Sequence, residues 1–181
     1  MLWQVGNVMD KLVLFVAQGF FIGRIPFAPG TFGSALGLLW VALLLWGHNP
    51  WLYGVGALLG IVCSVWLCGR AEKILGQIDP GSVVLDEIVA MPVCFAGWLV
   101  LRAWHDSQFP GPQSLVTGTG AWWTIGIYIA FRFFDIVKPW PVRQSQALPG
   151  GWGVTIDDVL AAAYVNLGVI AAWAVLPPAA R

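Results

Sequence analysis

Five long apolar segments, joined by short polar loops, dominate this sequence of 181 residues. An α-helix needs about 20 apolar residues to cross the hydrocarbon core of a bilayer, and it satisfies its own backbone hydrogen bonds there. Only 10% of the residues are charged, whereas soluble domains carry about a quarter. The sequence therefore predicts an all-α fold, a polytopic membrane helical bundle of about five spans. The expected spans are residues 31–47, 51–69, 83–104, 117–137 and 156–176.

The apolar stretch at residues 12–23 is about half as long as a membrane span and is expected to form an interfacial or re-entrant helix. Residues 1–181 are expected to form a single membrane-embedded domain. The formal net charge is zero, which gives no sign of a polyanionic partner such as nucleic acid. The oligomeric state stays open.

Basic residues predict the orientation of the bundle. Five of them fall in loops on one side of the expected spans: Arg24, Arg70, Lys73, Lys138 and Arg143. The opposite side has Arg102 and Arg181. Cytoplasmic loops carry the excess of Lys and Arg in membrane proteins, so the first side is expected to be cytoplasmic.

The acidic residues fall on the same side. Of the nine in the chain, six lie at or near the cytoplasmic ends of the last three expected spans: Asp79, Asp86, Glu87, Asp135, Asp157 and Asp158. A carboxylate at membrane depth costs a few kcal/mol, so adjacent pairs need a cation, a network or water. One alternative is that the pairs only complement the positive ends of their helices. The helix dipole accounts for a single acidic residue at the start of a helix, but it accounts poorly for two adjacent acidic residues inside an apolar segment.

Each acidic pair has a small residue four positions later. Ala90 follows Asp86 and Ala162 follows Asp158 at this spacing, which places each alanine on the face of its carboxylate. Small residues let membrane helices approach closely. The two helices are therefore expected to pack tightly near their acidic ends.

The stretch FRFFDIVKPWPVR ends the fourth span with charged residues. Arg132, Asp135 and Lys138 recur at a spacing of three, and Arg143 follows two prolines. Basic anchoring of the span is an alternative for Lys138 and Arg143, but it does not account for Arg132 and Asp135. Oxygen ligands in this number suit Mg²⁺, and the basic side chains suit a phosphate group.

The segment RIPFAPGTFGSALG precedes and begins the first span. Thr31 can cap that helix, and the backbone N–H groups near Ser34 are free to bind an anion. A plain capped helix is the alternative. His48 and His105 map to the opposite side, and no cysteine lies near the acids. Water activated by metal and carboxylate is therefore a better candidate nucleophile than a thiol or a serine–histidine pair.

Together these segments resemble the phosphatidylglycerophosphatase A family. The resemblance rests on APGTFGS, DPGSVVLDEIVAM, FRFFDIVKPWPVR and GGWGVTIDDVLAA, in this order along the chain. It implies a Mg²⁺-dependent phosphatase of the bacterial inner membrane, with its active site on the cytoplasmic side. The enzyme would convert phosphatidylglycerophosphate into phosphatidylglycerol. Alternatives are a phosphatase for another phosphomonoester lipid and an ion-coupled transporter.

On this hypothesis the charged residues divide into three groups. The expected Mg²⁺ ligands, direct or through water, are Asp86, Glu87, Asp157 and Asp158. The expected phosphate-binding residues are Arg132, Lys138, Arg143, Thr31 and Ser34. The expected catalytic residues are Asp86, Glu87, Asp135 and Asp158, where Asp135 either completes the metal site or holds Arg132. Direct attack by water and an aspartyl-phosphate intermediate both remain open.

Overall fold

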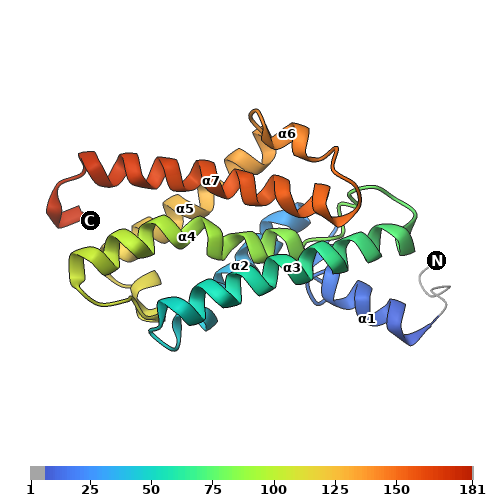
Figure 1. The fold of residues 1–181 in the computed structure, drawn as a ribbon, viewed down its shortest axis with the longest axis horizontal. Helices are drawn as coiled ribbons and strands as arrows, with labels where there is room; N and C mark the ends of the chain where they lie inside the picture. The colour runs from blue at the N-terminus through green and yellow to red at the C-terminus, as the bar shows by residue number, and fades with distance from the viewer. Residues whose placement is uncertain (1–6, 181) are drawn as a thin grey trace.

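The computed structural model describes residues 7–180, and all regular structure in this range is helical. The α-helices are α1 Val8–Ala17, α2 Pro29–Leu45, α3 Pro50–Leu75, α4 Leu85–Asp106, α5 Gly118–Val137, α6 Val142–Ser145 and α7 Gly151–Val175. Three of the long helices, α3, α4 and α7, run beside one another along the longest axis of the molecule (Figure 1). Short 3₁₀ helices occur at η1 Ile22–Arg24, η2 Pro112–Leu115 and η3 Pro178–Ala180.

Four of the described helices, α3, α4, α5 and α7, are long and apolar enough to cross a membrane. The fifth apolar helix, α2, has 17 residues and is shorter than a usual span. The prediction of a membrane helical bundle is confirmed, with its first span the shortest. The expected N-terminal helix is also present as α1, although it begins earlier than predicted and has only 10 residues.

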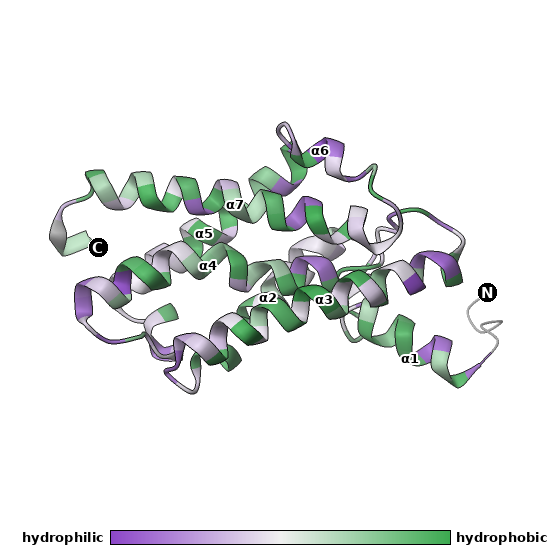
Figure 2. Ribbon diagram, viewed as in Figure 1, coloured by the Kyte–Doolittle hydropathy of each residue, from purple (hydrophilic) through white to green (hydrophobic). Residues whose placement is uncertain are grey.

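Helix α4 forms the centre of the bundle and packs most extensively against α7 and α2. Met91, Phe95 and Trp98 are fully buried in it. The outer helices instead expose large apolar side chains such as Trp66 and Leu59 of α3, and apolar residues recur along the outer helices in Figure 2. This arrangement is expected of a bundle whose outer surface faces lipid.

The predicted close packing of α4 and α7 is present. Ala90 and Ala162 are completely buried. Deeper in the bundle, the Asn166 side chain of α7 donates to Val93 O (2.8 Å) and accepts from Gly97 N (2.6 Å), both in α4. This amide joins the two helices by hydrogen bonds that lipid cannot replace.

Helix α4 begins partway along the bundle. The segment 76–84 runs back from the end of α3, and Val84 N donates to Ala17 O at the end of α1 (3.0 Å). Gly23 allows this approach, because a Cβ there would lie 1.9 Å from Ser82 O. The acidic pair at the start of α4 is therefore recessed from the end that α1 and α3 form.

Helix α7 begins at Gly151, five residues before the predicted start at residue 156. Its first residue packs on α3, where a Cβ on Gly69 would lie 2.8 Å from Gly151 N. The sequence prediction missed this turn because it placed the glycines in a loop. As a result, Asp157 and Asp158 lie in the second turn of α7 and not near its start.

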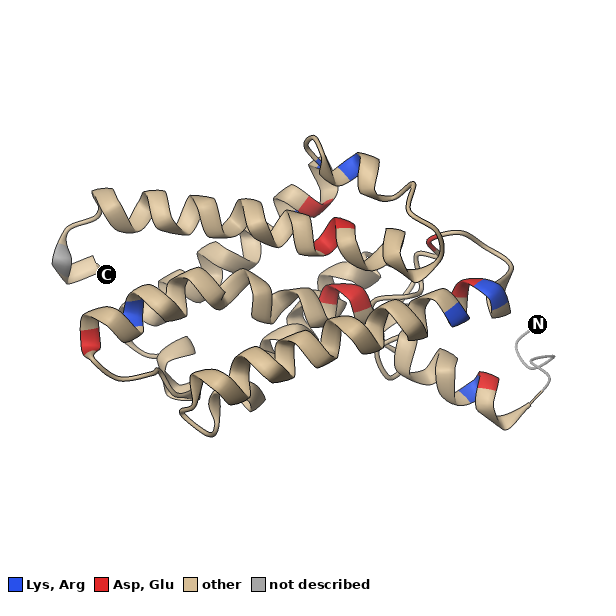
Figure 3. Cartoon of the chain, in the orientation of Figure 1, with Lys and Arg blue, Asp and Glu red and all other residues tan. Residues whose placement is uncertain are grey.

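The charged residues gather in separate parts of the bundle (Figure 3). At the end of α4, Arg102 Nε donates to Asp106 Oδ2 (2.6 Å), and His105 Nδ1 lies 2.8 Å from Asp106 Oδ1. The carboxylates of the starts of α4 and α7 lie away from this group. The predicted separation of the two sets of charges along the bundle is therefore present.

Candidate active site

The starts of α4 and α7 and the end of α5 enclose a polar pocket of about 280 Å³. The lining residues come from α4 and the loop before it, from the end of α5 and from α7, so residues far apart in sequence meet here. All six predicted carboxylates line the pocket together with one cation: Asp79, Asp86, Glu87, Asp135, Asp157, Asp158 and Lys138. We refer to it below as the acidic pocket.

Arg132 joins three elements beside the acidic pocket. Its Nη1 lies 3.1 Å from Glu87 Oε1 in α4 and 2.9 Å from Asp135 Oδ2 in α5. The same nitrogen donates to Ser34 Oγ of α2 (3.2 Å). Its Nε is buried without a hydrogen-bond partner. The guanidinium therefore compensates two carboxylates and keeps one donor unused.

Lys138, the residue that follows α5, holds the other side of the pocket. Its ammonium donates to Asp157 Oδ2 and lies 3.8 Å from Asp135 Oδ1. Burial disfavours the charged ammonium, but the hydrogen bond and the attraction of Asp157 and Asp135 raise the pKa of Lys138. Lys138 is therefore a cation throughout the neutral pH range. Asp135 lies between Arg132 and Lys138 and contacts both.

Asp86 and Asp158 differ from the other carboxylates of the pocket. They are 6% and 3% exposed, and within residues 7–180 neither forms an ion pair. Asp86 Oδ1 has no hydrogen-bond partner, and the same is true of Glu87 Oε2. A buried carboxylate without compensation is expensive. These oxygens are the part of the pocket that most needs a bound cation.

The glycines at the start of α2 make room for Glu87. A Cβ on Gly30 would lie 1.9 Å from Glu87 Oε1, and one on Gly33 would lie 2.6 Å from Glu87 Oε2. The anion at this helix start is thus a carboxylate of the protein, which the positive end of α2 favours. Ser34 and Thr31 were predicted to bind phosphate. In the structure Ser34 accepts from Arg132, and Thr31 O accepts from Tyr128 Oη (2.8 Å).

Two residues stand apart from the sequence prediction of the site. Arg143 lies exposed on α6 and does not line the acidic pocket. Asp79, to which no role was assigned, does line it. Its backbone N donates to Glu72 Oε1 (2.9 Å), and its Oδ2 accepts from Gln146 Nε2 (3.2 Å). Its position before Pro80 and Gly81 marks a turn next to the acidic pair, which was the available signal.

The pocket suits a hard divalent ion that keeps part of its water. Among the described residues, no three His, Cys, Asp or Glu side chains already form a ligand set. Mg²⁺ commonly binds one or two protein carboxylates and completes its octahedron with waters and substrate phosphate. The unpaired oxygens of Asp86 and Glu87 meet that smaller requirement.

Comparisons with known proteins place the chain among lipid phosphatases. A family model described as phosphatidylglycerophosphatase A matches residues 15–173. A Bacteroides thetaiotaomicron protein, provisionally named a phosphatidylinositol-3-phosphatase, is 34% identical over 91% of this chain and 96% of its own. Phosphatidylglycerophosphatase A of Escherichia coli is 35% identical over 86% of this chain and 79% of its own. The Haemophilus influenzae protein of that name is 33% identical over 86% of this chain and 85% of its own. No solved structure matches the chain significantly.

Proposed function

Since the chain belongs to the phosphatidylglycerophosphatase A family, we propose that it hydrolyses the terminal phosphomonoester of phosphatidylglycerophosphate. Water adds across the phosphorus–oxygen ester bond, and the products are phosphatidylglycerol and inorganic phosphate. The proposed location is the bacterial inner membrane, with the acidic pocket on the cytoplasmic side. The excess of basic residues at that side supports this orientation.

The acidic pocket is the observation that carries the proposal. It brings six carboxylates and Lys138 together at the ends of apolar membrane helices, and Arg132 adjoins it. A phosphomonoester on a lipid lies at the boundary between the bilayer and water. A recessed polar pocket at the ends of spanning helices can meet that group without removing the lipid tails from the membrane.

We also propose that the pocket binds Mg²⁺. Asp86 and Asp158 are the first candidates to hold the ion, because neither has a cationic partner in the part of the chain that the structure describes. Glu87 and Asp157 already contact Arg132 and Lys138, so they would be shared between these basic side chains and the ion. The ion would neutralise phosphate charge and increase the acidity of water at the site.

Arg132 and Lys138 would bind the phosphate oxygens. Arg132 keeps Nη1 on its carboxylates, and its other N–H groups, of which the buried Nε has no hydrogen-bond partner among the described residues, would serve the substrate. Asp135 orients both cations, since it contacts each of them. A carboxylate oxygen of Asp86 or Asp158 would accept the proton of the attacking water. Positioning and charge neutralisation supply most of the rate in such a reaction.

Phosphate release from liposomes tests the proposal. The purified full-length protein should release phosphate from phosphatidylglycerophosphate with Mg²⁺ and lose this activity with a chelator. Asp158→Asn should lower the rate at least about 100-fold. Asp106→Asn, the same change at the last residue of α4 and away from the acidic pocket, is the matched control and should retain wild-type activity.

The name of the Bacteroides relative adds a second substrate to the assay, a phosphatidylinositol 3-phosphate. Faster release from that lipid than from phosphatidylglycerophosphate would reassign the substrate but not the site. Absence of release from both lipids, with a properly folded protein, would contradict the proposed function. Ion flux into the same liposomes would then favour a transporter.

A further inference from the structure

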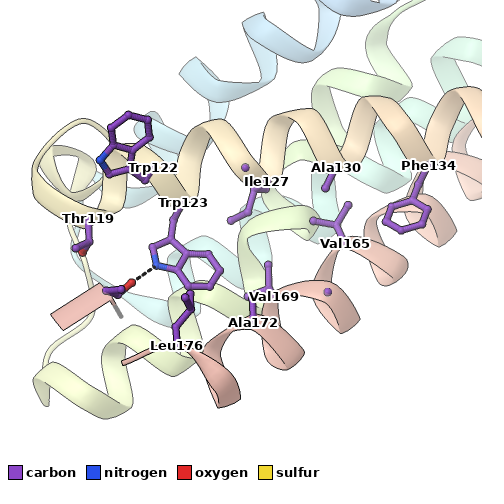
Figure 4. Close-up of a pocket in the computed structure, with 13 residues that line it drawn as sticks. Thr119, Trp122, Trp123, Ile127, Ala130, Phe134, Val165, Val169, Ala172 and Leu176 are labelled. Atoms are coloured by element: carbon purple, nitrogen blue, oxygen red, sulfur yellow. Dashed lines mark hydrogen bonds between the residues drawn. The ribbon is translucent and has the colours of Figure 1, made fainter. Parts of the chain in front are cut away.

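A second, apolar cavity of about 560 Å³ lies between α5 and α7 (Figure 4). Its α5 side includes Trp122, Trp123 and Ala130, and its α7 side includes Val165 and Ala172. Trp123 Nε1 donates to Ala180 O (3.1 Å), which fastens the C-terminal segment across the end that lies farther from the acidic pocket. Cavities of this size hold small ligands in many proteins. We call this cavity the α5–α7 groove.

The groove runs along the same two helices that form the acidic pocket. Its end nearer the pocket is at Phe134, which precedes Asp135 in α5 and stacks on Tyr164 of α7. From Phe134 to Thr119 the helix rises roughly 22 Å at 1.5 Å per residue. Half of the hydrocarbon core of a bilayer is about 15 Å thick. A chain that starts near the acidic pocket can therefore stay within the groove through its whole leaflet.

Two glycines keep the groove open. Gly126 of α5 and Gly168 of α7 line it, and a Cβ on either would meet no atom within 4 Å. Glycines in membrane helices usually allow a second helix to approach closely, but no other described helix comes within 4 Å of a Cβ at these two. A glycine within a helix is about 1 kcal/mol less favourable than alanine. Gly126 and Gly168 therefore leave the lining of the groove without a side chain at two positions.

We propose that the α5–α7 groove binds one acyl chain of the phospholipid whose phosphate occupies the acidic pocket. The inference rests on the proposed function, because it takes the substrate to be a phosphomonoester lipid. Its support is the position of the groove on α5 and α7, where Phe134 of its lining directly precedes Asp135 of the acidic pocket, together with its apolar lining and its length. The groove aligns the substrate, so that its headgroup reaches Arg132 and Lys138.

A Cβ at either glycine meets no protein atom within 4 Å, so a leucine side chain there is expected to occupy part of the groove. Gly126→Leu and Gly168→Leu are compared with Gly54→Leu in α3, where a Cβ also meets nothing within 4 Å and which does not line the α5–α7 groove. Each variant is assayed in mixed micelles with dioleoyl and dihexanoyl phosphatidylglycerophosphate. The groove variants should lose about tenfold in kcat/KM on the dioleoyl lipid and little on the dihexanoyl lipid. Gly54→Leu should match the wild type on both. Unchanged dioleoyl turnover, or equal losses on both lipids, would overturn the proposal.

Photolabelling of the wild-type protein gives an independent measurement. A phosphatidylglycerophosphate with a diazirine near the end of one acyl chain should label peptides of α5 and α7 around Trp123 and Ala172. Label spread evenly over all the outer helices would contradict a bound chain. If the lipid leaves no label and a bifunctional crosslinker instead joins α5 and α7 of two copies, the groove is a dimer interface and the proposal fails. If the wild type releases no phosphate from either the dioleoyl or the dihexanoyl lipid, the proposed function fails. The photolabelling alone then decides whether the groove binds an acyl chain.

Discussion

Compensation of charge distinguishes the carboxylates of the acidic pocket from one another. Arg132 contacts Glu87 and Asp135, whereas Asp86 is buried and forms no ion pair with any described residue. Carboxylates that are paired with a basic side chain, such as Glu87 and Asp135, support the folded structure through their ion pairs. Buried carboxylates without such a partner, such as Asp86, destabilise the folded structure until a cation binds. The two kinds of residue are therefore expected to respond to substitution in opposite ways.

Asp86→Asn should stabilise the protein in the absence of metal. The change removes an uncompensated buried charge but keeps the shape of the side chain. A gain of 1 kcal/mol raises the melting temperature of a chain of this size by about 2–4 °C. In detergent, the wild type should gain stability when Mg²⁺ is added and the variant should not. A variant that melts lower than the wild type and still responds to Mg²⁺ would contradict a metal role for Asp86.

Arg132→Gln should destabilise the protein, because it leaves Glu87 and Asp135 without their guanidinium partner. Removing one partner of a buried pair costs about 3–5 kcal/mol. The double variant Arg132→Gln with Glu87→Gln should recover much of this loss, as judged by thermal melting in detergent. No recovery would mean that the coupling between these two side chains is weak.

At the scale of helices, the approach of α2 to α4 depends on glycine. Gly30 and Gly33 face the carboxylate of Glu87 so closely that no Cβ fits. The motif APGTFGS thus serves as a surface on which the acidic start of α4 can rest. Helices α4 and α7 are held in register by the Asn166 amide, so their acidic pairs meet at one depth.

Gly30→Ala should displace Glu87, since the new Cβ would lie 1.9 Å from Oε1. Overpacking of this kind costs roughly 1–3 kcal/mol, and the rate of phosphate release should fall with it. Gly54→Ala in α3 is the matched control, because its Cβ has open space. The control should melt at or above the wild-type temperature. Equal melting and activity in the two variants would show that Glu87 moves aside freely.

At the scale of the whole molecule, cysteine labelling tests the proposed orientation in the membrane. Gln77 follows α3 near the acidic pocket, and Gln108 follows α4 beyond the opposite charged group; both are exposed. Single cysteines at these positions should react differently with a membrane-impermeant maleimide. Cys63→Ala is the starting protein, since Cys68 and Cys94 are buried. In intact cells Gln108→Cys should be labelled and Gln77→Cys should not. The reverse pattern would place the acidic pocket outside the cytoplasm.

The sequence alone determined the helical membrane class, the approximate spans and the gathering of six carboxylates at one depth. Apolar length and the cost of charge in lipid depend on composition and order along the chain, so they are readable without coordinates. Which charged side chains contact one another was decided only by the tertiary structure. Only there do Arg132, Glu87 and Ser34 meet, Arg143 fall outside the pocket, and Asp86 remain without a cation. Such contacts depend on helix rotation and on where each helix begins, and long-range packing of α2, α4, α5 and α7 decides both.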